Sequence, residues 1–135
     1  MMTLKSFQED PYVTANPESL PFWRAAEEGV LLGKSCGDCG KVHWYPREIC
    51  PFCGSDHTEW KPLSGRGTVY AFSTLRRAAQ PYTVAYVQLE EGPTMLTNLV
   101  EIDDNDMRIG MPVRVAFRRT DEGRNAPTFT AETAR

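Results

Sequence analysis

The chain has 135 residues, 41% of them hydrophobic, which predicts one domain, or one domain with a small appendage, around a modest core. Its 15 Lys and Arg against 18 Asp and Glu give a formal net charge of −3. This disfavours a nucleic-acid binding role, since such domains carry clustered basic residues. No apolar run is long enough to span a bilayer, and residues 1–6 lack the apolar core of a signal peptide, so we expect a cytoplasmic protein.

A short amphipathic helix is predicted within residues 16–29. Asn16 or Ser19 can cap it, Pro17 or Pro21 suits a first helical position, and Gly29 suits the position just after a helix end. The apolar stripe of this helix would consist of Leu20, Phe22, Trp23 and Ala26. Residues 1–15 show no apolar periodicity and are expected to be weakly ordered.

Four cysteines follow as two Cys-x-x-Cys pairs, Cys36 with Cys39 and Cys50 with Cys53, separated by ten residues. This spacing is typical of a zinc ribbon, in which two tight turns hold four thiolates around one tetrahedral ion. A site closed by four sulfurs has no open position for water, so we predict a structural zinc. Iron also suits an all-sulfur site, and disulfides are a third alternative, although a reducing compartment disfavours them.

Strands are expected on both sides of the first cysteine pair, at residues 30–35 and 41–46. His43 and His57 lie near the cysteines, but with four sulfurs available we expect them behind the ligands or at the surface. Aromatic side chains are expected to shield the metal from water, namely Trp44, Tyr45 and Phe52. The chain is thereby divided into an N-terminal segment (1–29), a zinc ribbon (30–60) and a C-terminal domain (61–135).

From residue 58 onward the pattern is that of short strands. They are expected at residues 59–62, 67–75, 83–89, 95–101, 113–118 and 127–132, and are rich in β-branched and aromatic residues. Five to six short strands with bends marked by glycine predict a small closed barrel, most simply an OB-fold. Alternating aromatic residues of a barrel belong more often to its core than to a stacking surface, so Tyr70, Phe72 and Tyr86 are expected inside.

Candidate catalytic residues are not evident. Both histidines flank the cysteine pairs, so a Ser-His-Asp arrangement is not supported. The glycines at 65 and 67 precede a strand rather than a helix, which indicates a bend and not a phosphate-binding loop. The loop after the first long strand is more informative, because Arg76 and Arg77 match the geometry of phosphate groups.

The order of these parts resembles a known family. A short helix and a four-cysteine ribbon precede the segments 63–70, 81–89 and 109–115, which include a Gly-x-Gly-Thr-Val strand and a Gly-Met-Pro-Val turn. This order is similar to that of the zinc-ribbon and OB-fold proteins labelled domain of unknown function thirty-five. The resemblance covers residues 16–133.

The resemblance implies an acyl-CoA context. Members of this family are accessory subunits, without catalytic residues of their own, of thiolase-fold enzymes that include thiolases, acyltransferases and the thiolase-like aldolases of steroid side-chain breakdown. It implies docking on such a partner, with contacts to the partner or to acyl-CoA at Arg76, Arg77, Pro81 and Tyr82. The alternatives are a module that binds single-stranded nucleic acid, since both ribbons and OB-folds serve that purpose, and an electron carrier with iron bound by the cysteines.

Overall fold

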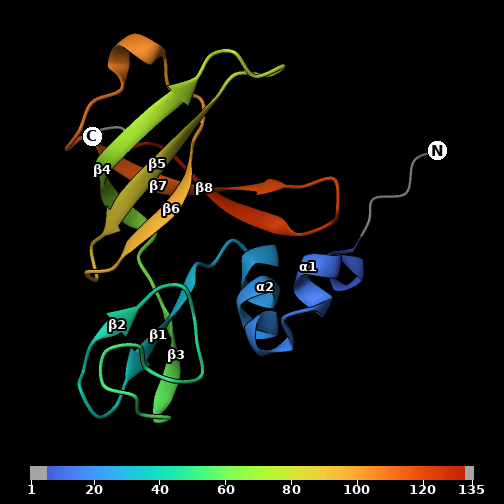
Figure 1. Ribbon diagram of the computed structural model, residues 1–135, viewed down its shortest axis with the longest axis vertical. Helices are drawn as coiled ribbons and strands as arrows, with labels where there is room; N and C mark the ends of the chain where they lie inside the picture. Colours follow the sequence, from blue (N-terminus) through green and yellow to red (C-terminus); the bar gives the residue numbers. More distant parts are fainter. Residues whose placement is uncertain (1–5, 133–135) are drawn as a thin grey trace. The chain divides into compact units, whose positions relative to one another are not determined.

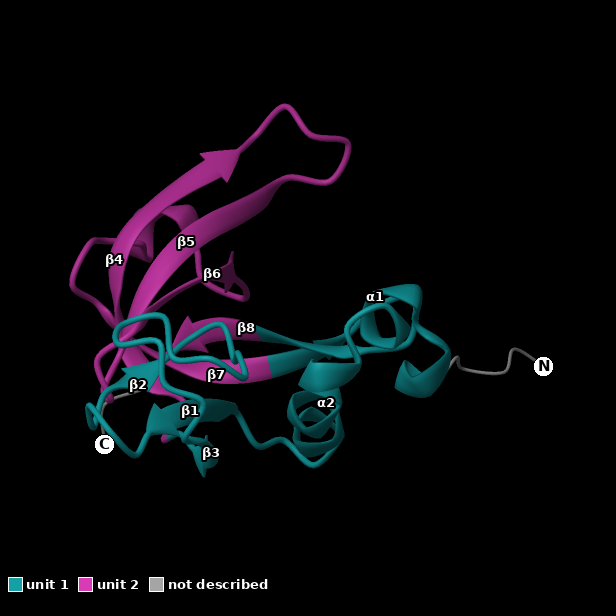
Figure 2. Ribbon diagram, turned by 60° about the horizontal axis from the view of Figure 1, so that its bottom comes forward, with its two compact units in different colours: residues 1–63, 117–127 teal, residues 64–116, 128–135 magenta. Residues whose placement is uncertain are grey.

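The computed structural model describes residues 6–132, and the chain forms two compact units (Figure 1 and Figure 2). Unit 1 comprises residues 1–63 and 117–127, and unit 2 comprises residues 64–116 and 128–135. Among the described residues, unit 1 holds the helices at the start of the chain and a three-stranded sheet. Unit 2 holds most of a closed barrel.

The chain begins with short helical segments: η1 (Phe7–Glu9), α1 (Pro11–Thr14) and η2 (Pro17–Ser19). Asp10 caps α1, accepting a hydrogen bond from the Tyr12 N–H at 2.8 Å. Both Asp10 and Val13 are buried. The expectation of weak order is therefore wrong for residues 6–15, because polar caps and one buried ion pair order this stretch without an apolar repeat; residues 1–5 lie outside the described part.

The predicted amphipathic helix is confirmed as α2 (Leu20–Glu27). Its apolar stripe is buried at Phe22, Trp23 and Ala26, while Leu20 is half-buried. The helix ends before Gly29, which has a φ of +77°, a conformation that glycine adopts without steric cost.

The tip of the hairpin at 117–127 belongs to unit 1. Its side chains form hydrogen bonds and ion pairs with the N-terminal helical segment. Arg119 donates to both carboxylate oxygens of Glu27, at 2.6 and 2.8 Å. Arg124 pairs with buried Asp10 at 2.9 Å, and the Asn125 amide donates to the Ala26 carbonyl at 2.8 Å. These polar contacts join residues about one hundred positions apart, so no local sequence pattern predicts them.

The ribbon sheet consists of β1 (Leu32–Cys36), β2 (Val42–His43) and β3 (Thr58–Pro62), in the antiparallel order β2-β1-β3. The predicted strand at 59–62 exists but belongs to this sheet, not to the barrel. It does so because β3 pairs with β1 along its whole length, from Leu32 opposite Pro62 to Cys36 opposite Thr58.

The barrel confirms the predicted OB-fold. It closes in the order β4-β5-β6-β8-β7, from β4 (Arg66–Leu75), β5 (Tyr82–Leu89), β6 (Thr94–Leu99), β7 (Pro112–Arg119) and β8 (Asn125–Ala131). A short η3 (Asp104–Asp106) lies in the predicted loop between β6 and β7. The core is filled by inward apolar residues of these strands, including Val69, Val87, Met95, Val113 and Phe129.

Glycine is required where β4 enters the barrel. A Cβ atom on Gly67 would lie 2.4 Å from the Gln88 carbonyl oxygen, so a side chain cannot be placed between β4 and β5 at this point. Gly65 has a φ of +78°. These two glycines form a bend at the start of a strand, as their position in the sequence indicates.

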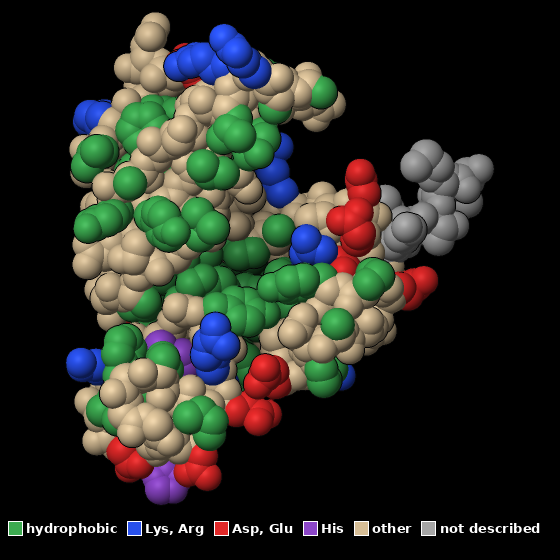
Figure 3. Space-filling view, viewed as in Figure 1, with side chains coloured by type: hydrophobic (Ala, Val, Ile, Leu, Met, Phe, Trp, Pro, Cys, Tyr) green, Lys and Arg blue, Asp and Glu red, His purple; other side chains and the backbone are tan. Residues whose placement is uncertain are grey.

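Two aromatic residues expected in the core lie outside it. Tyr70 is 64% exposed and Tyr86 is 47% exposed, whereas Phe72 is half-buried. A β-bulge shifts the β4–β5 register between Val69 and Ala71, so that Ala71 pairs with Tyr86 on the outer face. Hydrophobic side chains accordingly emerge over the outer surface of the barrel strands (Figure 3).

Candidate functional site

The four cysteine sulfurs lie together at one end of the ribbon sheet. All four Sγ atoms lie within 4.8 Å of one another, with Cys36 to Cys53 at 3.6 Å and Cys39 to Cys50 at 3.7 Å. Four sulfurs at 2.3 Å from a tetrahedral zinc would be about 3.8 Å apart. All four cysteines are free thiols. The cluster is therefore positioned to bind a metal ion and is not a pair of disulfides.

The two cysteine turns have the same local geometry. The N–H of Gly40 donates to the Cys36 carbonyl and the N–H of Gly54 donates to the Cys50 carbonyl, both at 2.9 Å. Both glycines have positive φ, at 76° and 79°. Each turn also directs a backbone N–H at its first sulfur, that of Cys39 at Cys36 Sγ and that of Phe52 at Cys50 Sγ. These donors favour the thiolate form that a metal requires.

Deprotonation of all four cysteine thiols depends on a bound cation. The N–H of Cys39 is the main cause that lowers the pKa of Cys36 to about 6. For Cys53, the N–H of Ser55 lowers the pKa, but burial and the neighbouring thiols together raise it to about 12. Four adjacent thiolates repel one another, so full deprotonation of the cluster requires a bound cation.

Neither histidine joins the metal cluster within residues 6–132. His43 is buried, and its Nε2 accepts a hydrogen bond from the Arg47 N–H at 3.3 Å. His57 is exposed and its Nδ1 lies 3.1 Å from Asp38, whose hydrogen bond raises the pKa of His57. The histidines lie behind the ligands or at the surface, where the sequence places them.

The aromatic shield expected around the metal is absent from the described ribbon. Phe52 is 56% exposed, with the Lys41 ammonium over its ring at 4.9 Å. Trp44 and Tyr45 pack instead on Phe22 of α2, with ring centroids 4.9 and 6.4 Å apart. A stripe of aromatic residues on α2 offers these two rings more apolar contact than the cysteine turns do.

The other predicted contact residues share one hairpin, β4–β5, and all are exposed: Arg76, Arg77, Pro81 and Tyr82. Arg76 forms an ion pair with Asp104 of η3. Arg77 makes no ion pair with any described residue, which leaves its guanidinium available to a phosphate. The backbone pairing of Leu75 with Tyr82 closes the loop.

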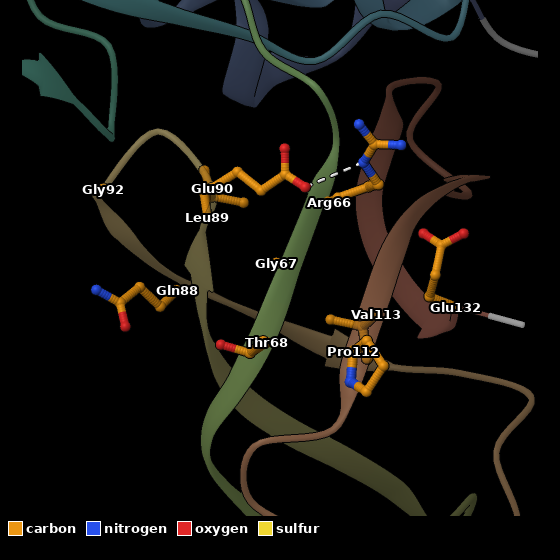
Figure 4. A pocket seen from close by; sticks show the side chains of 10 residues that line it. All are labelled: Arg66, Gly67, Thr68, Gln88, Leu89, Glu90, Gly92, Pro112, Val113 and Glu132. Carbon is orange, nitrogen blue, oxygen red and sulfur yellow. Dashed lines mark hydrogen bonds and ion pairs between the residues drawn. The ribbon is translucent and has the colours of Figure 1, made fainter. Parts of the chain in front are cut away.

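A hollow of about 470 Å³ lies on the barrel where β4, β5 and β7 meet (Figure 4). The Arg66 Nε and the Glu90 carboxylate pair across one side of it at 3.1 Å, and the Glu132 carboxylate stands on another side. Gly67 contributes no side chain to its floor. No sequence pattern indicates this hollow, because its lining comes from four separate segments.

Comparison with known proteins gives two family models that match in succession. They are the rubredoxin-like zinc ribbon domain of ChsH2 over residues 23–59 and the C-terminal OB-fold domain of ChsH2 over residues 60–118. A DUF35 domain-containing scaffold protein of Methanocaldococcus jannaschii is 38% identical over 74% of this chain and 77% of its own length. The chain belongs to the DUF35 family.

Two further proteins are similar along most of the chain. The benzoylsuccinyl-CoA thiolase subunit BbsA of Geobacter metallireducens is 33% identical over 70% of this chain and 68% of its own length. The solved structure of an Ltp2-ChsH2(DUF35) aldolase is 31% identical, with a TM-score of 0.72 over 84% of this chain and 93% of that one. None of the described helices of the present chain is long and apolar enough to cross a membrane.

Proposed function

We propose that this chain is a non-catalytic accessory subunit that docks on a thiolase-fold acyl-CoA enzyme and helps to shape its acyl-CoA site. The observation that carries this proposal is the likeness to the Ltp2-ChsH2(DUF35) aldolase over nearly the whole of that chain. The relative BbsA, a benzoylsuccinyl-CoA thiolase subunit, supports a partner of the thiolase class and a CoA ester as the shared substrate.

The chemistry of the described residues supports a role without catalysis. The four thiols lie in one metal-binding cluster, so none serves as a nucleophile. His43 is buried against the backbone of Arg47, and His57 is held by Asp38. The hollow of the barrel offers the Arg66–Glu90 ion pair, the Glu132 carboxylate and a threonine hydroxyl, but no histidine or cysteine. We propose that the acid–base pair for thiolysis or aldol cleavage comes from the partner.

The ion in the cysteine cluster is proposed to be zinc with a structural role. Four sulfurs complete a tetrahedral site and leave no position for a substrate or water. Zinc supplies folding free energy to a ribbon sheet whose middle strand has five residues. Elemental analysis distinguishes it from iron, which would also colour the purified protein red.

The loop at 76–81 is proposed to contact the partner or the CoA held between the subunits. Arg77 offers a guanidinium without a described ion pair, and exchange of the Asp104 carboxylate for a phosphate would release Arg76 toward CoA. Pro81 restricts the loop before docking, which lowers the entropy that binding costs. Tyr82, 47% exposed, belongs to a residue type that is frequent among interface hot spots.

Reconstitution tests the proposed function. Each thiolase-fold protein encoded in the same genome is co-expressed with the tagged chain, purified, and assayed for thiolysis and retro-aldol cleavage of acyl-CoA substrates. The chain alone is expected to show no turnover, and one partner is expected to lose its activity when the chain is omitted. Turnover by the pure chain, or a failure of every thiolase-fold protein to bind it, would refute the proposal.

A further inference from the structure

Beyond Arg66 at the start of β4, the outer face of β4, β5 and β6 lacks charge to an unusual degree for this chain. Residues 68–75, 82–89 and 94–99 include no Asp, Glu, Lys or Arg, although charged residues make up 24% of the chain. Three large side chains project from the middle of these strands: Tyr70, 64% exposed, Leu96, 60% exposed, and Tyr86, 47% exposed. We call this surface the uncharged face and define it by Tyr70, Ala71, Ser73, Val84, Tyr86 and Leu96.

The backbone register places these side chains in one row. Tyr86 of β5 pairs with Ala71 of β4 on one side and with Leu96 of β6 on the other. The bulge next to Val69 inserts Tyr70 beside Ala71. A shallow hollow of about 200 Å³ lies next to Tyr70, and its almost wholly apolar lining includes Ala71, Tyr86 and Leu96. The uncharged face is therefore a continuous surface and not a set of scattered apolar residues.

This composition fits a protein partner better than a nucleic acid. Single-stranded nucleic acid is bound by aromatic platforms combined with basic residues that follow the backbone. Residues 68–75, 82–89 and 94–99 have no Lys or Arg, and Arg66 at the start of β4 is paired with Glu90. The central part of a protein interface is instead depleted in charge and enriched in tyrosine. Because the barrel is closed, with β6 paired to β8, a partner would meet side chains here and not an open strand edge.

The uncharged face is large enough to form the centre of a protein interface but not the whole of one. Tyr70, Tyr86 and Leu96 together expose on the order of 400 Å², whereas a standard interface takes about 800 Å² from each protein. The remaining area requires a polar rim. The strands β4 and β5 run directly from this face into the loop at 76–81, whose arginines supply a charged rim at one end.

We infer that the uncharged face is the docking surface for the thiolase-fold subunit, with Tyr70, Tyr86 and Leu96 as its anchors. This inference rests on the proposed function, which supplies the identity of the partner. The matching surface of that subunit is accordingly apolar and free of charge where it meets the three anchors. The loop arginines lie at the margin and add little to the affinity between the proteins.

Substitutions of outward-facing residues test this inference. The dissociation constant is measured by biolayer interferometry with the thiolase-fold subunit identified by co-expression, using Leu96→Arg, Leu96→Ser and Tyr86→Ser. Each is expected to weaken binding, Leu96→Arg by about 30-fold or more. Ile49→Ser removes a comparably exposed apolar side chain from the ribbon, where Ile49 is 51% exposed, and should change the affinity less than about twofold. Zinc content and thermal unfolding confirm that each variant is folded. If Leu96→Arg does not fold, Leu96→Ser replaces it in the binding measurement.

The possible results separate the surface from the function. Unchanged affinity in all the folded face variants overturns the docking surface and leaves the accessory role standing. If the unmodified chain binds no thiolase-fold subunit, the role and the surface fail together. A homodimer in sedimentation velocity that Leu96→Arg dissociates, with partner binding unchanged, would make this a self-association surface and refute the inference. Binding of a fluorescent oligo-dT strand that Tyr86→Ser abolishes would refute it as well.

Discussion

Asp10 illustrates how a single buried carboxylate orders the start of the chain. Its side chain accepts hydrogen bonds from the Tyr12 N–H at 2.8 Å and from the Arg124 guanidinium at 2.9 Å. Burial by itself raises the pKa of Asp10, but the Tyr12 N–H and the Arg124 guanidinium together outweigh it, so the pKa lies below its usual value. The carboxylate is consequently more stable in the folded chain than in the unfolded one.

Acidification should therefore destabilise the helices of unit 1. The contribution of Asp10 is complete above its unfolded pKa of about 3.9 and is lost as the pH falls through the lower folded value. Asp10→Asn should lower the melting temperature at pH 7 and flatten its decline between about pH 5 and pH 2. Circular dichroism measures both effects. Asp121→Asn, at an exposed position, should retain the unmodified profile; an equally steep decline in Asp10→Asn would contradict this assignment.

A second prediction concerns the absence of a Cβ atom at Gly67. In Gly67→Ala the new Cβ would lie 2.4 Å from the Gln88 carbonyl oxygen and 2.8 Å from Val87, so β4 and β5 must move apart. We expect the free energy of unfolding to fall by about 3 kcal/mol in urea titrations. Gly37→Ala, whose Cβ would meet no atom closer than 3.4 Å, should cost clearly less. Equal losses in the two variants would show that the close approach of β4 and β5 is not the cause.

At the scale of elements, the ribbon depends on its four sulfurs. Cys39→Ser removes one ligand and should reduce bound zinc from about one ion per chain to near zero. Limited proteolysis should then cleave within the ribbon, because its short strands have lost the free energy of metal binding. Mass spectrometry of the metal and of the fragments follows both effects. His57→Ala should retain its zinc, since His57 lies outside the cluster; metal loss in that variant would reopen the choice of ligands.

How far the sequence predicts each element depends on the range of the interactions that form it. The ribbon and α2 were predictable, because cysteine spacing and the apolar stripe are local patterns. The barrel followed from its short strands, but the sheet to which β3 belongs did not, since its partner β1 lies more than twenty residues earlier. The order around Asp10 was missed for the same reason, because Arg124 follows more than one hundred residues later. The exposure of Tyr70 and Tyr86 follows the alternation of β4 and β5, in which Val69, Ala85 and Val87 are buried; the expectation that aromatic residues fill the core assigned both tyrosines to the wrong face.

At the scale of the whole molecule, the loop arginines are expected to act on the ligand more than on the protein partner. Arg76→Ala with Arg77→Ala should weaken acyl-CoA binding to the reconstituted complex by about tenfold or more, because charge-assisted contacts with phosphate are lost. The affinity of the unmodified complex for acyl-CoA should fall as salt is added, and that of the double variant should respond less. Isothermal titration at several salt concentrations measures both. Arg114→Ala, an exposed arginine on β7, is the control.

An unaltered affinity and salt response in the double variant would show that the loop is only a solvent-exposed hairpin end. If Arg114→Ala weakens acyl-CoA binding equally, the cause would be the overall charge of the barrel and not the loop. Neither result would bear on the uncharged face, whose substitutions are measured against the protein partner.

The path of the chain through its two units limits how the gene can be divided. The polypeptide leaves unit 1 after residue 63, returns to it at 117–127 and ends in unit 2. A gene cut after codon 63 would yield an N-terminal fragment without Arg119, Arg124 and Asn125, which bond Glu27, Asp10 and Ala26. Recombination that exchanges residues 1–63 as a block between relatives would separate these partners in the same way. The N-terminal helices and the hairpin tip at 117–127 therefore need to be kept together in any exchange, although they lie far apart in the sequence.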